Sequence, residues 1–331
     1  AATLALVTYG AASQIGTAPP TFAIVSNRPR DVPESYQRYL TNGFREVWPF
    51  TGSPNCPWVR GICNLPSMTF SFSFPGFFSS SHRWMDAMSV DYSCLFPTLM
   101  LAIGLHPEPE MEVELCWAYN RWLTEKVLPE SNGRFFSSLC LPFSDPEQSL
   151  RHVETFGHRK GVTGFMVTTV RNIQVNDNAL MKVYRAMEER DLSLSFHSGP
   201  NWSEPVFRAC NRFLSVHALG FSFYNILHCT NWVINGLSER FPKLPVVWIE
   251  AGLAWVPFVM QKMDHEYMLR PSEAPLLKKK PSDYMRDMYY SSQPMEIQDE
   301  EALQNTFRMI NAETQLLYSS DYPHWDFDTP G

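Results

Sequence analysis

The strongest constraint on the fold is an alternation of short apolar segments with helix-patterned segments, which runs from residue 91 to residue 320. The apolar segments are rich in β-branched and aromatic residues, which is typical of buried strands. The longer segments between them carry apolar residues at helical spacing. Parallel strands need connections of this length, so the pattern predicts an α/β fold with a parallel sheet covered by helices.

The strands expected from this pattern are Thr21–Ser26, Asp91–Pro97, Phe135–Pro142, Val162–Thr168, Leu192–His197, Pro245–Glu250, Met288–Ser292 and Leu316–Ser320. The expected helices are Asp31–Tyr39, Met111–Val127, Asp145–Phe156, Asp177–Asp191, Val206–Arg240, Val256–Leu269 and Glu300–Asn311. Eight such strands predict a distorted (β/α)8 TIM barrel that occupies residues 1–331 as one domain. A doubly wound open sheet is the alternative, but no G-x-G-x-x-G follows any strand.

Residues 48–82 break the alternation. Pro, Ser, Gly, Asn and Phe dominate this segment, and no periodicity holds. We expect a long irregular insertion after the first βα unit, which serves as a lid or as a dimer contact. For the helix that begins near Asp145, we expect Ser144 to be the N-cap and Pro146 to lie in the first turn.

Composition excludes several classes of function. The formal net charge is −7 and the basic residues are scattered, which argues against nucleic acid or an anionic membrane as a partner. The longest apolar stretch, Leu95–Leu105, is too short to cross a bilayer. Among the seven cysteines no tight C-x-x-C pair occurs, and although Cys56 and Cys63 could form a bridge, the other five are expected to be free thiols, which indicates a cytoplasmic location. The aromatic content of 14% favours a pocket for an apolar or aromatic small molecule.

Chemically competent side chains stand at the ends of three predicted strands. His197 and Glu250 each end a strand, and Asp321 with His324 follows the last one. Singly, these residues have ordinary interpretations as a core histidine, a cap partner and a turn acid. In a barrel, however, the carboxyl ends of the strands converge on one mouth. Two carboxylates and two imidazoles there predict a metal or acid/base site suited to Zn, Fe or Mn.

Three segments of the chain resemble the amidohydrolase-related family of metal-dependent barrel enzymes. They are SFHSGP, ERFPKLPVVWIEAGLAWVPFVMQKMD and LLYSSDYPHWDFD, and the resemblance covers roughly Asp86–Asp328. The family includes aminocarboxymuconate-semialdehyde decarboxylase, resorcylate-type decarboxylases and hydrolases. The resemblance implies one or two divalent metal ions, Zn first, with His197 and Asp321 as ligands. It also implies that Asp321 shuttles a proton.

Two departures from the family pattern stand out. Glu250 occupies the position where the decarboxylases carry a His, and as a carboxylate it can ligate metal or act as a general base. The family's His-x-His pair after the first strand has no counterpart, because no His precedes His82. Our interpretation is that residues are absent between the flanks AIVS and RPRDVPESYQRYL. The alternative is a member that lost its first-strand ligands.

The pattern predicts a hydrolase in which a metal-activated water cleaves an amide, ester, thioester or activated C–C bond of an apolar or aromatic acid, with Asp321 and Glu250 as catalytic residues. We expect His324, His217, Trp202 and Trp325 to contact the substrate. One alternative is a non-oxidative decarboxylase of an aromatic or muconate-type acid. Another is a metal-free barrel that acts as a binding protein. The family resemblance implies a homodimer.

Overall fold

The computed structural model describes residues 9–17, 20–26, 74–169, 173–199, 201, 204–322 and 324. The chain divides into two compact units, Ala1–Arg83 and Trp84–Gly331. In the first unit, β1 (Tyr9–Thr17) and β2 (Pro20–Ser26) form an antiparallel two-stranded sheet. The prediction that Thr21–Ser26 is the first barrel strand is therefore wrong. Its β-branched pattern suits any strand and does not specify the partner.

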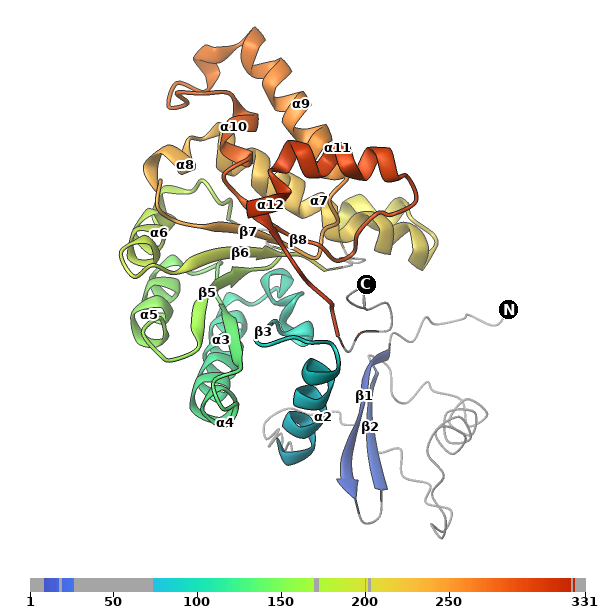
Figure 1. Ribbon diagram of the computed structural model, residues 1–331. Helices are drawn as coiled ribbons and strands as arrows, with labels where there is room; N and C mark the ends of the chain where they lie inside the picture. The colour runs from blue at the N-terminus through green and yellow to red at the C-terminus, as the bar shows by residue number, and fades with distance from the viewer. Residues whose placement is uncertain are drawn as a thin grey trace, which may run out of the picture. The chain divides into compact units, whose positions relative to one another are not determined.

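The second unit contains the parallel sheet that the alternation predicted. Its described strands are β3 (Ser93–Leu95), β4 (Phe135–Cys140), β5 (Val162–Val167), β6 (Ser193–His197), β7 (Val246–Ile249), β8 (Tyr289–Ser291) and β9 (Leu316–Leu317). Among the described residues these seven strands pair in chain order, each parallel to the next. Figure 1 shows the sheet curling with its helices on the outside, as in a TIM barrel.

Helices connect and cover these strands. The α-helices are α2 (Phe74–Ala87), α3 (Pro109–Trp122), α4 (Leu128–Glu130), α5 (Pro146–Phe156), α6 (Met181–Glu188), α7 (Phe213–Ile234), α8 (Leu237–Arg240), α9 (Trp255–Leu269), α10 (Pro281–Met285), α11 (Glu300–Ile310) and α12 (Ala312–Gln315). Short 3-10 turns lie at Thr98–Met100, Ile103–Leu105, Asn178–Leu180, Pro205–Ala209 and Pro271–Glu273, and a π-turn at Leu123–Val127. Asp145, rather than Ser144, caps α5, and its side chain accepts from the backbone N–H groups of Glu147 and Gln148.

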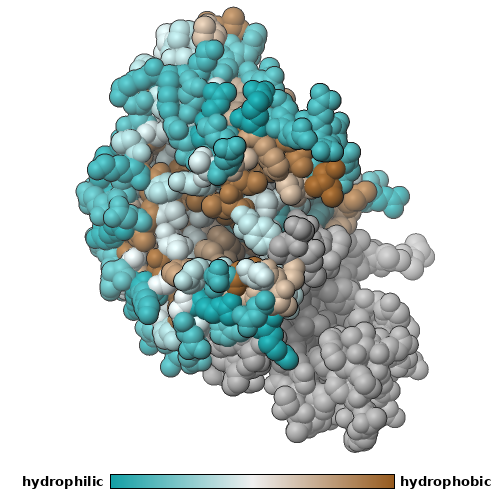
Figure 2. All heavy atoms as spheres, in the orientation of Figure 1, coloured by the Kyte–Doolittle hydropathy of each residue, from teal (hydrophilic) through white to brown (hydrophobic). Residues whose placement is uncertain are grey.

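The core lies between the sheet and its helices. Phe196 and Trp248, on adjacent strands, stack with ring centroids 4.5 Å apart, and both are buried. Large aromatic pairs of this kind contribute much of the burial energy of a domain. Figure 2 shows mostly hydrophilic residues over the outer helices on the visible face, and hydrophobic residues gathered near its middle. The charge-free helix α7 also exposes apolar side chains, such as Leu214 and Leu219.

The sheet register places the carboxyl ends of the strands together. His197 is the register partner of Ile249, so Glu250 lies one residue beyond that pair. Ser291 is the partner of Leu317, four residues before Asp321. The side chains expected at one mouth are therefore delivered to one end of the sheet.

The two edge strands of the sheet are also linked near that end. His324 Nε2, after β9, lies 2.9 Å from Thr98 Oγ1, after β3. Tyr322 stacks on Trp84 of α2 with centroids 4.4 Å apart and an interplanar angle of 12°. Side-chain contacts thus connect the segments that flank the first and last described strands of the barrel sheet.

Residues 48–73 of the expected insertion lie outside the described residues, and 74–82 belong to α2. The lid or dimer-contact role of the segment, and the organisation as one domain, stay predictions. No described helix is long and apolar enough to cross a bilayer.

Candidate metal and active site

The predicted strand-end residues come together at the carboxyl end of the sheet. Glu250, Asp321 and His324 each offer one ligand atom, and these atoms all lie within 4.8 Å of one another. All three side chains are partly buried. Among the described residues they form the group best placed to hold a metal ion, and the set combines carboxylate oxygens with an imidazole nitrogen. Such a hard-to-borderline donor set suits Mn²⁺, Fe²⁺ or Zn²⁺.

His197 joins this group through Glu250. Its Nε2 lies 3.0 Å from Glu250 Oε2, and its side chain is 3% exposed. Its Nδ1 lies 2.9 Å from the backbone carbonyl of Ser198. That carbonyl can only accept, so Nδ1 carries a hydrogen and Nε2 is the atom presented to the site. A ring held in this way by a carbonyl is typical of metal-ligating histidines.

Asp321 and His324 form a hydrogen-bonded chain. His324 Nδ1 lies 2.9 Å from Asp321 Oδ2, and its Nε2 lies 2.9 Å from Thr98 Oγ1. A carboxylate, an imidazole and a hydroxyl are therefore linked in series. Groups linked in this way can pass a proton between a reacting centre and the surrounding residues.

Both carboxylate residues of the site have an unusual backbone conformation. Glu250 has φ of 50° and Asp321 has φ of 58°, both in the left-handed region. For residues other than glycine, this conformation costs about 1–2 kcal/mol and needs support from its surroundings. Glu250 receives such support from Ser291, whose Oγ accepts from the Glu250 backbone N–H at 2.9 Å. Sharp turns after β7 and β9 thus direct the side chains of Glu250 and Asp321 toward each other.

The remaining predicted site residues are placed differently. His217 lies on α7 with Phe213 and Phe221 at centroid distances of 5.1 and 5.3 Å, and it does not belong to the Glu250–Asp321–His324 group. Its contact with substrate stays a prediction. Trp202 and Trp325 lie outside the described residues. Thr98, by contrast, gave no signal in the sequence, because a threonine after Pro97 is indistinguishable from an ordinary turn residue.

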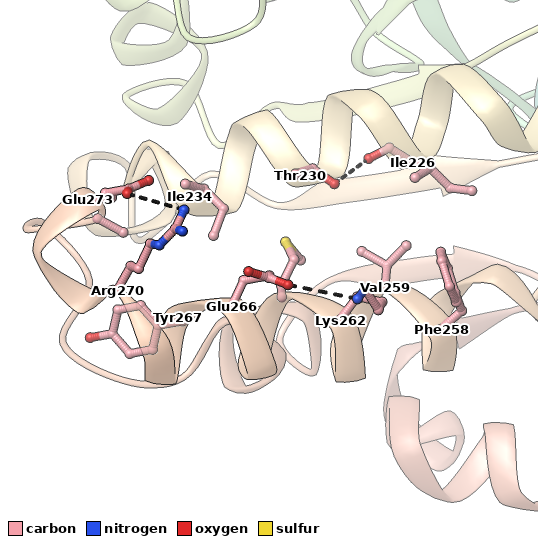
Figure 3. Close-up of a pocket in the computed structure, with 12 residues that line it drawn as sticks. Ile226, Thr230, Ile234, Phe258, Val259, Lys262, Glu266, Tyr267, Arg270 and Glu273 are labelled. Carbon is pink, nitrogen blue, oxygen red and sulfur yellow. Dashed lines mark hydrogen bonds and ion pairs between the residues drawn. The ribbon is translucent and has the colours of Figure 1, made fainter.

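The described residues also form a groove away from these side chains. It has a volume of about 330 Å³ and lies between α7 and α9. Figure 3 shows Ile226 and Thr230 on one side facing Val259 and Phe258 on the other. Lys262 pairs with Glu266 at 3.8 Å along this groove, a surface pair of adjacent helical turns. None of the predicted site residues lines the groove, so the candidate site is at the strand ends.

Two histidines are buried elsewhere. Burial lowers the pKa of His152 to about 4, and the charge of Arg151 acts in the same direction. Burial also lowers the pKa of His228 to about 4, against the effect of a hydrogen bond with the Thr168 backbone. Both imidazoles are therefore neutral at physiological pH, and their surroundings favour structural roles.

Comparison with known families matches two parts of the chain to different proteins. An amidohydrolase family model matches residues 97–330. A model of the KH-domain-like C-terminal region of EngA bacterial GTPase enzymes matches residues 7–55. The curated relatives that match are GTPases as well. GTPase Der of Geobacter metallireducens is 58% identical over 43 residues, which is 13% of this chain and 10% of that protein. GTPase Der of Gemmatimonas aurantiaca is 54% identical over 43 residues, again 13% and 10%.

The match to a GTPase region removes the basis for the interpretation that residues are absent after the first predicted strand. The segments AIVS and RPRDVPESYQRYL were interpreted as the flanks of the first-strand ligand pair, with a few residues absent between them. They match a different family instead, and β2 pairs with β1 outside the barrel sheet. The chain spans about a tenth of the length of these GTPase relatives.

Solved structures with the same fold cover most of the chain. 5-Carboxyvanillate decarboxylase LigW from Sphingomonas paucimobilis is 21% identical with a TM-score of 0.58, and the match covers 74% of this chain and 72% of that one. 2,6-Dihydroxybenzoate decarboxylase from Rhizobium is 19% identical with a TM-score of 0.59, over 74% and 77%. 5-Carboxyvanillate decarboxylase from Novosphingobium aromaticivorans, in complex with manganese and 4-hydroxy-3-methoxy-5-nitrobenzoic acid, is 19% identical with a TM-score of 0.60, over 74% and 70%.

Proposed function

Since the chain belongs to the amidohydrolase family, we propose that it is a metal-dependent decarboxylase of a hydroxylated aromatic carboxylic acid. The observation that carries the proposal is the cluster of Glu250, Asp321 and His324, with His197 bonded to Glu250. Decarboxylases of this substrate class share the fold, and one was solved with manganese. This reverses the order of preference drawn from the sequence, where hydrolysis came first.

The donor set fits a single divalent ion. Two carboxylates and an imidazole supply three N/O ligands, and His197 Nε2 is directed to the same place. Three or four protein ligands leave room for a substrate oxygen, as in catalytic metal sites. When bound, the ion would supply positive charge that orients an anionic substrate and stabilises charge on its oxygens. Manganese is the first choice, because it is the ion named in related structures; Zn and Fe remain alternatives.

The protein side chains would then manage the proton. Decarboxylation breaks the bond between the ring carbon and the carboxylate, releases CO2, and places a proton on the same ring carbon. Asp321 would deliver that proton, and His324 Nδ1, 2.9 Å from Asp321 Oδ2, would donate a hydrogen bond that stabilises the carboxylate left behind. Glu250, held against His197, would fix the orientation of the substrate rather than transfer the proton.

Hydrolysis remains the second candidate, because the Glu250 carboxylate could act as a general base toward a water molecule. Incubation of the manganese-loaded protein with 2,6-dihydroxybenzoate and with 5-carboxyvanillate, in ¹⁸O-labelled water, separates the two. The decarboxylase proposal predicts stoichiometric CO2 and a phenol without ¹⁸O from solvent. Turnover of an ester or amide with ¹⁸O incorporation, and no CO2 from either acid, would favour the hydrolase.

A control variant distinguishes active-site chemistry from contamination. Asp321→Asn keeps the size of the side chain but replaces the ionisable carboxyl with an amide that does not transfer a proton, so CO2 release should fall to background while the circular dichroism spectrum stays unchanged. CO2 release at the wild-type rate in this variant would show that Asp321 is not the proton donor.

The homodimer and the small-molecule partner are part of the same proposal and rest on family resemblance. Sedimentation velocity of the purified chain tests the dimer directly; a single species at the monomer mass would rule it out.

A further inference from the structure

Helix α7 contacts the turn after β7 on both sides of Glu250. Ser222 Oγ donates to the carbonyl of Ala251 at 2.7 Å. Asn225 Nδ2 donates to the carbonyl of Ile249 at 3.3 Å. The two side chains are three residues apart and therefore share one face of the helix. Their hydrogen bonds hold the backbone of the residues directly before and after Glu250.

A third hydrogen bond to this turn comes from Ser291 on the neighbouring strand. The backbone N–H of Glu250 donates to Ser291 Oγ at 2.9 Å. Ser291 ends β8 and is 4% exposed, so this hydroxyl has little access to solvent as an alternative partner. The peptide groups around Glu250 are thus held from two elements. Since Glu250 has φ of 50°, these bonds support a backbone conformation that glutamate rarely adopts alone.

The same helix also contacts the turn that follows His197. The carbonyl of Gly220 accepts from Asn201 Nδ2 at 3.4 Å and from Ser198 Oγ at 3.5 Å. The carbonyl of Ser198 in turn faces His197 Nδ1. One rigid helix therefore bonds to both turns whose side chains meet in the 3.0 Å contact between His197 and Glu250.

We propose that Ser222, Asn225 and Ser291 are positioning residues, which hold the Glu250 carboxylate where it can ligate the metal ion. None of the three belongs to the ligand group, so each acts through the backbone of residues 249–251. The inference rests on the proposed metal site and deepens it. Groups that orient a ligand contribute about tenfold to a hundredfold in metal affinity when they are removed.

The chain offers a matched control for this effect. Ser149, in α5, donates from Oγ to the carbonyl of Pro142 at 2.7 Å. It is a buried helix serine that bonds to the turn after a barrel strand, as Ser222 does, but β4 carries none of the proposed ligands. Ser149→Ala should therefore lower stability without changing metal affinity.

The experiment titrates Mn²⁺ into chelator-stripped full-length protein, with free Mn²⁺ followed by electron paramagnetic resonance. Ser222→Ala and Ser291→Ala should each raise the Mn²⁺ Kd about tenfold. Ser222→Thr, which keeps the hydroxyl, and Ser149→Ala should stay within about twofold of wild type. Asn225→Asp, which exchanges the amide donor for an acceptor, should weaken binding like Ser222→Ala.

The Glu250→Gln background decides whether the effect passes through Glu250. There, adding Ser222→Ala should change the Kd no further, whereas another tenfold loss would overturn the inference. Wild-type affinity in both serine-to-alanine variants, with Glu250→Gln impaired, would also overturn it while leaving the metal site in place. Wild-type affinity in Glu250→Gln itself would overturn both the inference and the proposed site.

Discussion

His152 should make the protein sensitive to acid, and the structure gives both the sign and the size of the effect. Asn120 fixes the protonation state of this buried ring. Its Oδ1 accepts from the Cys140 backbone N–H at 2.9 Å, and its Nδ2 donates to the Cys140 carbonyl at 2.7 Å. The amide orientation is therefore set by the backbone. The second Nδ2 hydrogen points to His152 Nδ1 at 3.1 Å, which must accept and so must be unprotonated.

The sign of the pH dependence follows from the lowered pKa. Burial lowers the pKa of His152 from 6.5 to about 4 in the folded protein. Between these values the unfolded chain binds more protons than the folded one, so protonation favours unfolding. The stabilising contribution is complete above the unfolded pKa and is lost as the pH falls through the window between 6.5 and about 4. From about pH 7.5 to about pH 4.5, His152 should remove about 2–3 kcal/mol from the free energy of unfolding.

Urea denaturation of wild type and of His152→Gln at both pH values measures this contribution. Glutamine retains an acceptor for Asn120 but does not titrate. The difference between the two proteins cancels the other groups, including His228, whose pKa is also lowered to about 4. The free energy of unfolding lost on acidification should be about 2–3 kcal/mol smaller in the variant. An equal loss in both proteins would refute the argument.

Three further substitutions test contacts in the barrel. Asn120→Leu leaves the Cys140 backbone unpaired in the core and should lower the free energy of unfolding by about 3 kcal/mol, measured in urea; a loss under about 1 kcal/mol would contradict the pairing. Gly164→Ala would place its Cβ 2.1 Å from the Ser193 carbonyl oxygen, so we expect little soluble folded protein, and a wild-type melting temperature would contradict the close approach of β5 and β6. Trp84→Ala removes the stack on Tyr322, next to Asp321, and should weaken Mn²⁺ binding by about 1 kcal/mol, roughly fivefold; an unchanged Kd would mean that the stack does not hold this turn.

The local pattern of apolar residues was sufficient to predict most strands of the barrel. The segment Pro245–Glu250 was predicted as a strand, and β7 spans Val246–Ile249. Its run of apolar residues between a proline and a glycine-containing turn specifies a short buried strand without any tertiary information. The convergence of Glu250 and Asp321 also followed from the sequence, because the carboxyl ends of parallel strands share one end of the sheet.

Other features depend on contacts that sequence spacing does not encode. Thr21–Ser26 forms a strand as predicted, but its partner is β1 rather than a barrel strand. Nothing in a β-branched run distinguishes these pairings. The cap of α5 is a smaller case. Ser144 and Asp145 are both good N-cap residues, yet Asp145 directly precedes Pro146, which favours the first helical position and therefore marks Asp145 as the cap.

The side chains that hold the turn around Glu250 were not predicted from the sequence either. Ser222 and Asn225 lie within an uncharged and mostly apolar helix, where their roles are visible only once β7 is seen to end beside it. Their spacing of three residues on one face was the available signal. Polar residues at such spacing in an apolar helix are candidates for contacts with a neighbouring turn.

The central claim is that the strand-end cluster is a metal site, and Mn²⁺ binding by chelator-stripped wild type and Asp321→Asn tests it most directly. We expect about one equivalent of tightly bound Mn²⁺ for wild type, and an affinity at least about tenfold weaker for Asp321→Asn, because a carboxylate ligand is replaced by a neutral amide. Equal affinity in the two proteins, or no binding to wild type, would contradict it.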